Sequence, residues 1–330
     1  MNEVNNKFRY ILIGFCFCSE ILSQDLSFSQ FYANSLYYNP SFAGASDYKR
    51  ITASYRNEWP GLDSKFVTYF SSFDQPVEFL HGGVGIYVFN DLAGNGTLSK
   101  SAISLLYSYH MQATRDFFLF AGFQTTLFHK SLSEKNLIFP DMIDPVRGVV
   151  NPTLESFTGS RRNYFDFSVG FLGIYKELFG GIAFHHLAEP NEAEISSDEA
   201  KLSRKYTFHI GNNILFKKPG RMSSAIKITP TVVITKQRQF ERIIYGLSFS
   251  VEPLTIGGWI KQDFSFRFDS YITGVALSLS GIDLVYSYDI APFGAKSTKN
   301  GSGAHEISVS LRLENKVKRS LVKTINYPKL

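Results

Sequence analysis

Apolar and polar residues alternate along this chain in segments that reach ten or more residues, and the pattern recurs almost to the C-terminus. Ile103, Leu105 and Tyr107, for example, share one face of such a segment, with Ser104 and Ser108 on the other. A period of two gives a strand one apolar and one polar face. Soluble strands usually have about five or six residues, whereas tilted strands that cross a membrane need about nine to eleven. Because every backbone polar group must be paired in lipid, strands of this length predict a closed barrel.

The pattern therefore predicts an all-β fold, an up-and-down antiparallel transmembrane β-barrel of about fourteen strands. The expected strands are 49–59, 65–73, 82–90, 98–112, 116–130, 163–175, 178–186, 204–216, 224–236, 240–251, 254–262, 269–278, 281–289 and 304–313. Long connections follow the fifth, seventh and thirteenth strands, and the shortest follow the fourth, sixth, tenth and twelfth. Outer-membrane barrels show this parity, with long loops outside and tight turns in the periplasm. An even number of strands also predicts that both termini lie on the periplasmic side.

The first residues, 1–23, have the layout of a secretory signal peptide. Two basic residues, Lys7 and Arg9, precede an apolar run that is too short to span a bilayer. Both cysteines of the chain, Cys16 and Cys18, lie in this leader. The mature chain is then expected to contain no disulfide, no cysteine nucleophile and no thiolate metal site.

Between the leader and the first strand lies an aromatic, Asn-rich segment, 24–48, that has neither helical nor strand periodicity and carries a turn signal at Asn39-Pro40. Barrel closure does not require this segment. A lumen of about fourteen strands is intermediate between a side-chain-filled small barrel and an open porin. We therefore interpret the segment as a plug that folds into the lumen or as a docking element at its periplasmic mouth. The barrel itself is assigned to 49–313 and a basic tail to 314–330.

The composition gives little support to an enzyme or a nucleic-acid-binding protein. The net charge of +5 is small for 330 residues, and no nucleophile motif or phosphate loop is present, so no cofactor is expected. Carboxylates in the long loops lack the spacing of a calcium loop. His185 and His186 are adjacent, so on a strand they should face opposite sides. Charges such as Arg56 and Lys261 should face the lumen or the rims, because a cation facing lipid at mid-bilayer costs about 2–4 kcal/mol.

A set of motif positions runs in order over nearly the whole mature chain: Phe28, Gln30, Phe31, Tyr32, Asn39, Pro40, Phe42, Arg56, Trp59, Pro60, Pro140, Asp141, His185, His186, Pro190, His305 and Glu306. The motifs to which they belong resemble those of the PorP/SprF family, which is tied to the type IX secretion system of Bacteroidetes, and we take these positions as family-motif or partner-binding residues. The tail after Leu313 has no match. The resemblance implies a bacterial outer-membrane barrel that serves protein export, surface anchoring of adhesins or gliding motility. Its implied partners are outer-membrane lipid, periplasmic ring or motor components and an exported surface protein.

Two functions stay open at this point, with a barrel of purely structural use as a third. One is an accessory component of type IX secretion, which rests on the resemblance and on the aromatic segment. The other is a diffusion channel for small solutes, which rests on the barrel and its charged lumen alone. No feature of the sequence identifies the exported cargo.

Overall fold

The computed structural model describes residues 25–61, 66–133, 161–192, 201–216, 225–290 and 303–313, together with 137, 139–144, 146–150 and 154. The expected signal peptide and the basic tail lie outside these residues. In the described part of the chain, no helix is long and apolar enough to cross a membrane.

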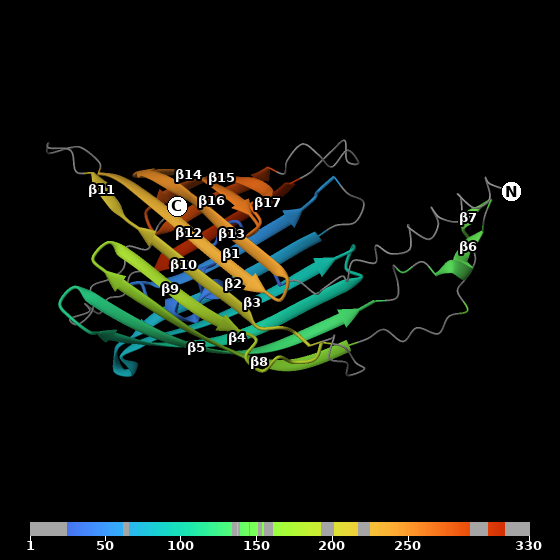
Figure 1. The fold of residues 1–330 in the computed structure, drawn as a ribbon, viewed down its shortest axis with the longest axis horizontal. Coiled ribbons are helices and arrows are strands. Elements are labelled where there is room, and N and C mark those ends of the chain that lie inside the picture. Colours follow the sequence, from blue (N-terminus) through green and yellow to red (C-terminus); the bar gives the residue numbers. More distant parts are fainter. Residues whose placement is uncertain are drawn as a thin grey trace.

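Fourteen antiparallel strands close into a barrel, as the alternation predicts (Figure 1). The strands are β1 (Lys49–Glu58), β2 (Phe66–Val77), β3 (Gly82–Ala93), β4 (Leu98–Gln112), β5 (Phe117–Leu132), β8 (Arg161–Tyr175), β9 (Leu178–His185), β10 (Lys205–Asn212) continued by β11 (Ile214–Phe216), β12 (Ile226–Gln237), β13 (Phe240–Val251), β14 (Leu254–Gln262), β15 (Phe268–Leu279), β16 (Ile282–Ile290) and β17 (Gly303–Leu313). The first and last strands pair from Lys49↔Leu313 to Glu58↔Ala304, and the β10–β12 pairing completes the wall.

The helical elements are short and are not part of the paired strands that form the barrel wall. They are α2 (Ser35–Tyr38), η1 (Pro40–Phe42), η2 (Glu78–Leu80) and η4 (Pro140–Met142). A small hairpin of β6 (Ile143–Asp144) and β7 (Gly148–Val149) belongs to the connection between β5 and β8, and it lies beyond the barrel wall at the right of Figure 1.

One barrel strand is interrupted between β10 and β11. The register on either side of the gap, Gly211↔Thr231 and Ile214↔Ile228, places Pro230 of β12 at the interruption. Proline has no N–H to donate to a ladder, so the pairing lapses there and resumes beyond it in the same register. The sequence predicts one continuous strand because the alternation of faces is not disturbed.

The two faces of the wall differ as the period of two requires. Outward side chains are apolar and exposed, such as Leu105 at 56% and Ile256 at 53%. Inward polar side chains are buried, and Ser104, Ser287 and Glu306 are all 0% exposed. Water would wet such side chains in an open pore. The lumen is therefore packed around them.

The connections define two ends of the barrel. We call the end at which β1, β5 and β9 finish the loop end, and it carries the connections 133–160 and 186–204. The opposite end, here the turn end, carries short connections such as 113–116 and 176–177. The connections named in the prediction lie at the expected ends, the long ones at the loop end and the shortest at the turn end. The connection 217–225 is an exception to the general rule, because it is longer than the other connections at the turn end.

Candidate functional site

Residues 25–48, here the lumen segment, fill the barrel and run between its two ends. At the loop end, the Asp25 carboxylate lies 3.3 Å from Nζ of Lys100, close to the start of β4. At the turn end, the backbone N–H of Gly44 donates to the Asp74 carboxylate at 3.0 Å. The first and last strands do begin and end together at the turn end, as an even strand count predicts. Asp25, however, lies near the loop end and not at the turn end, because the lumen segment crosses the lumen before β1 starts.

Aromatic side chains of the lumen segment form much of the barrel core. Its large buried apolar side chains are Phe28, Phe31, Tyr32, Leu36, Tyr37, Tyr38 and Phe42. Phe31 meets the Trp259 ring edge-on at 5.8 Å, and Tyr32 stacks on the same ring at 5.5 Å. Burying a large apolar side chain is worth about 1.5–3 kcal/mol relative to leaving it in water. The aromatic richness of this segment therefore supplies the apolar burial that holds it inside a largely polar wall.

Three inward glycines let the lumen segment pack directly against the wall. They are Gly83 on β3, Gly122 on β5 and Gly170 on β8. A Cβ at Gly122 would lie 2.3 Å from the backbone N of Ser41, and one at Gly170 would lie 2.1 Å from Oδ1 of Asn39. Real Cβ atoms do not approach other atoms so closely. The Asn39-Pro40 turn predicted from the sequence is thus seated on wall positions where only glycine fits.

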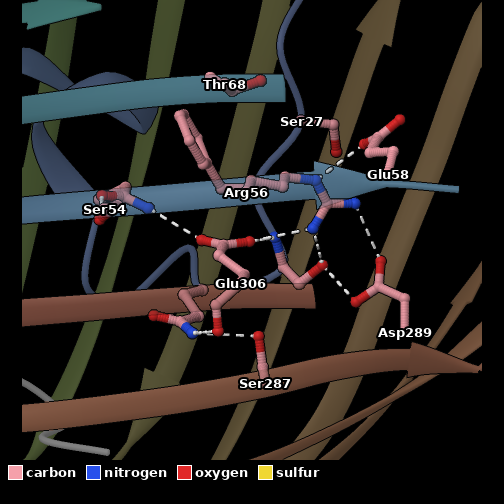
Figure 2. A network of polar contacts seen from close by, with 12 residues as sticks. Ser27, Ser54, Arg56, Glu58, Thr68, Ser287, Asp289 and Glu306 are labelled. Atoms are coloured by element: carbon pink, nitrogen blue, oxygen red, sulfur yellow. Dashed lines mark hydrogen bonds and ion pairs between the residues drawn. The ribbon is translucent and has the colours of Figure 1, made fainter. Parts of the chain in front are cut away.

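Arg56 lies at the centre of a buried ionic network near the loop end (Figure 2). Its guanidinium is 3.0 Å from the Glu306 carboxylate on β17, 3.1 Å from Asp289 on β16 and 2.8 Å from Glu58. Arg56 and Glu306 are also direct cross-strand partners in the β1–β17 ladder. A guanidinium offers five N–H donors and can therefore serve several carboxylates at once. The network joins β1 to the two closing strands.

Glu306 also fastens the lumen segment to the wall. Its carboxylate accepts from the backbone N–H of Ser29 at 2.8 Å and from the Asn34 side chain at 3.1 Å. The Gln30 side chain donates to the backbone carbonyl of Glu306 at 2.8 Å and to the Ser287 hydroxyl at 3.1 Å. Hydrogen bonds to a buried carboxylate are among the stronger ones in proteins. Arg56 and Glu306, predicted as motif residues, therefore belong to one structural unit with the predicted Gln30.

A second ionic cluster holds the start of the lumen segment at the loop end. The Asp25 carboxylate lies 2.5 Å from Nε2 of His186 and 2.9 Å from Nζ of Lys205, with Lys100 slightly further away. His186 Nδ1 lies 2.7 Å from the Asp166 carboxylate. Burial raises the pKa of Asp25, but His186 and the two lysines hold that pKa well below its usual range. Burial lowers the pKa of His186, and the two carboxylates outweigh this effect and raise it.

These shifts predict that pH controls how firmly the start of the segment is held. Because the pKa of His186 is raised in the folded protein, protonated His186 stabilises the fold fully at a pH below about 6.5, the ordinary pKa of histidine. This stabilisation is lost as the pH rises through the folded-state pKa. The depressed Asp25 pKa contributes stability above about 3.9 that is lost only in stronger acid. We expect thiol labelling of a Ser27→Cys variant, corrected for its thiolate fraction, to accelerate as the pH rises above neutrality. The same variant with His186→Gln should lose this dependence, and an identical pH profile in both would contradict it.

His185 and His186 both point into the lumen, so the prediction that they face opposite sides was wrong. His185 lies on β9, and its Nε2 is 3.2 Å from the Tyr38 carbonyl. His186 follows the last residue of β9 and has a φ of 58°, which turns its side chain back inward. The two rings are 6.4 Å apart. The alternation rule failed because the strand ends one residue earlier than expected.

The remaining predicted positions lie in the loops, at the rim or on the outer face. They are Trp59, Pro60, Pro140, Asp141, Pro190 and His305. Trp59 is 42% exposed and meets the ring of Phe66 edge-on at 5.1 Å. The Nδ1 atom of His305 lies 2.9 Å from the hydroxyl of Tyr286. Asp141 accepts a backbone N–H of its own loop at 2.6 Å.

Several charged residues of the site were not among the predicted positions. Glu192 bridges Lys100 at 2.9 Å and Lys130 at 2.8 Å, and it accepts from the Tyr164 hydroxyl at 2.6 Å. Burial raises the pKa of Glu192, but the two lysines lower it to about 2. Lys100 joins this group to Asp25. The alternation places Lys100 on the inward face, which was the available signal. Its partners could not be found in this way, because Asp25 comes from the lumen segment and Glu192 from the loop that follows β9. Among the described residues, no group of three or more His, Cys, Asp or Glu side chains is placed to hold a metal ion.

A closed antiparallel barrel with an apolar outer face defines this chain as a β-barrel protein of the bacterial outer membrane. Its residues 21–311 match the family described as "Type IX secretion system membrane protein PorP/SprF". The chain belongs to this family, which confirms the resemblance seen in the motifs. No curated protein matches the chain.

Solved structures with a similar fold are distant in sequence. CdiB from Acinetobacter baumannii has a TM-score of 0.44 and 7% identity, and the match covers 80% of this chain and 60% of CdiB. A Pseudomonas aeruginosa FadL homologue has a TM-score of 0.41 and 12% identity, over 86% of this chain and 94% of the homologue. The TodX deltaS2S3 mutant, a monoaromatic hydrocarbon channel, has a TM-score of 0.43 and 11% identity, over 85% and 94% of the two chains.

Proposed function

We propose that this barrel is an accessory component of type IX secretion that supports the export or surface anchoring of a cargo protein and links it to periplasmic components. Family membership establishes the secretion system. The observation that carries the finer proposal is the lumen segment, which runs through the barrel between its two ends. By the general arrangement of outer-membrane barrels, the loop end faces the outside and the turn end the periplasm. A segment in contact with both ends is suited to couple a partner on one side to a partner on the other.

The packed lumen argues against the alternative of a small-solute diffusion channel. A pore needs a continuous wet path, whereas inward side chains such as Ser104 and Ser287 are 0% exposed. The inward charges that motivated the channel hypothesis are engaged in ion pairs: Arg56 with Glu306, and Lys261 with Asp289 at 3.2 Å. Lumen charge therefore supports attachment of the segment better than it supports ion conduction.

Deletion of residues 24–44 tests the proposal. We expect the shortened barrel to reach the outer membrane, because the described residues within 24–44 take no part in the strand pairing that closes the barrel. Secretion of type IX cargo and co-purification of periplasmic secretion components should both be lost. Gel mobility before and after heating would confirm that the shortened barrel is folded.

A second variant separates side-chain contacts from chain length. Replacing 24–44 by a glycine and serine segment of the same length keeps the connection to β1 and removes the aromatic and Asn contacts. We expect the same loss of secretion and partner binding. If either folded variant secretes cargo and retains its partners like the unmodified chain, the lumen segment does not have the proposed role.

A further inference from the structure

One strand of the barrel wall has an unpaired edge at the turn end. In the described part of the chain, β11 pairs with β12 alone. On the other side, β9 begins at Leu178, opposite Asn212. The last backbone contact from that side is made by the N–H of Asn213, which donates to the Glu177 carbonyl at 3.0 Å. The three residues of β11 therefore extend past the β8–β9 turn, at the left of Figure 1, with no described strand beside them.

The side chains of β11 are apolar and exposed on both faces of the strand. Ile214 and Phe216 point outward, where lipid accounts for their exposure. Leu215 lies on the inward face, as Asn213 does, yet it is 45% exposed, so it lies at the mouth of the barrel beyond the packed lumen. Lipid does not reach the inward face. A strand that combines a free edge with exposed apolar side chains is a template for pairing with another strand.

The sequence around β11 is strongly cationic. Residues 200–240 contain no Asp or Glu, but they contain nine Lys or Arg, and four of the nine fall at positions 217–227, directly after β11. Lys227 of β12 is the direct ladder partner of Leu215, so both side chains are on the same face of the sheet. Charge complementarity therefore favours an acidic partner for this edge over a basic one.

This charge also distinguishes between the candidates for the edge. The tail of the chain, 314–330, follows β17 but is basic itself, with five Lys or Arg and one Glu. A second copy of β11 would bring the same cationic sequence. Lipid headgroups cannot continue a ladder of backbone hydrogen bonds. An extended peptide segment with apolar and acidic side chains meets all of these requirements.

We propose that β11 is a docking strand, to which an extended segment of a periplasmic secretion component adds as a further strand. The backbone of that segment pairs with the free edge of 214–216, an apolar side chain contacts Leu215, and carboxylates lie near Lys227. In strand addition, backbone hydrogen bonds provide the affinity and alternate side chains the specificity. The inference rests on the proposed function, because it takes the turn end to face the periplasm and the partner to be a secretion component.

Fluorescence anisotropy with labelled peptides tests this site on the folded barrel in phosphatidylcholine nanodiscs, which leave both ends accessible. The probe is a short peptide in which glutamate and valine alternate. One companion peptide has lysine in place of each glutamate, and another has proline in place of the central valine. The glutamate peptide is expected to bind at least about tenfold more tightly than either companion, because like charges repel and proline has no N–H to donate.

Two barrel variants and one control locate the binding on β11. Leu215→Ser should weaken the glutamate peptide by about fivefold through lost apolar contact, and Lys227→Gln by about threefold through lost charge. Leu254→Ser is the matched control. Leu254 is 48% exposed at the same end, but its strand, β14, is paired on both sides. Its substitution should leave the affinity unchanged.

Several results would overturn the docking strand. They are no binding of the glutamate peptide, equal binding of the proline peptide, an unchanged affinity in both Leu215→Ser and Lys227→Gln, or an equal loss in Leu254→Ser. Equal or tighter binding of the lysine peptide would assign the edge to a basic segment such as 314–330 instead. Peptide binding does not depend on secretion. Loss of secretion on deletion of 24–44 without peptide binding would therefore retain the proposed function and reject only this site.

Discussion

Replacing Arg56 by alanine is expected to destabilise the barrel by about 3–5 kcal/mol, because it leaves the buried Glu306 carboxylate without its cation. Asp289 keeps a second partner, Lys261, at 3.2 Å, but no other cation lies at ion-pair distance from Glu306 among the described residues. Glu306 also holds Ser29 through a hydrogen bond at 2.8 Å, so the same change should loosen the lumen segment. The free energy of unfolding, measured by denaturant titration in lipid vesicles, would show the loss.

Two further variants make this measurement specific. Lys236→Ala removes an exposed pair with Glu241, in which Lys236 is 52% exposed, and should change the free energy of unfolding by less than about 1 kcal/mol. Adding Glu306→Gln to Arg56→Ala removes the unpaired charge and should recover part of the lost stability. Equal effects of Arg56→Ala and Lys236→Ala would show that the buried network does not stabilise the fold.

Replacing Gly122 by leucine is expected to displace the lumen segment from the wall and open the barrel. The new Cβ would lie 2.3 Å from the backbone N of Ser41, so the wall strand and the turn cannot both keep their places. The strand is held by ladders on both sides, whereas the turn is held by fewer contacts, and we expect the turn to move. In planar bilayers the variant should show ion conductance that the unmodified barrel lacks.

Gly258→Leu is the matched control for this change. Gly258 lies on β14, and a Cβ there would meet nothing within 4 Å. The same side chain is thus added to another barrel glycine without a clash. Conductance in the Gly258→Leu variant equal to that of Gly122→Leu would mean that the added side chain, and not the displaced segment, opens the barrel.

The wall could be predicted from the sequence because membrane strands have two chemically distinct faces and one regular period. The network of Arg56 and Glu306 could be predicted in part, because closing the barrel brings the first strand, which carries Arg56, beside the last strand, which carries Glu306. Their register, which makes them direct partners 250 residues apart in sequence, depends on the whole barrel and could not be derived locally.

The path of the lumen segment could not be predicted from the sequence, for a different reason. An irregular segment has no period, and its position depends on single contacts such as Asn39 against Gly170 and Asp25 against His186. The parity of the connections located the start of β1 but gave no information on where Asp25 lies. The inward turn of His186 depends on one left-handed residue, which a strand pattern does not reveal.

Conductance of the purified, unmodified barrel in planar bilayers tests most directly whether the lumen segment fills the barrel. The packed inward side chains and the contacts of residues 25–48 with the wall predict a silent bilayer, with steady openings only after the segment is deleted or displaced. Steady large openings from the unmodified barrel would contradict this account and would restore the solute channel as the better interpretation.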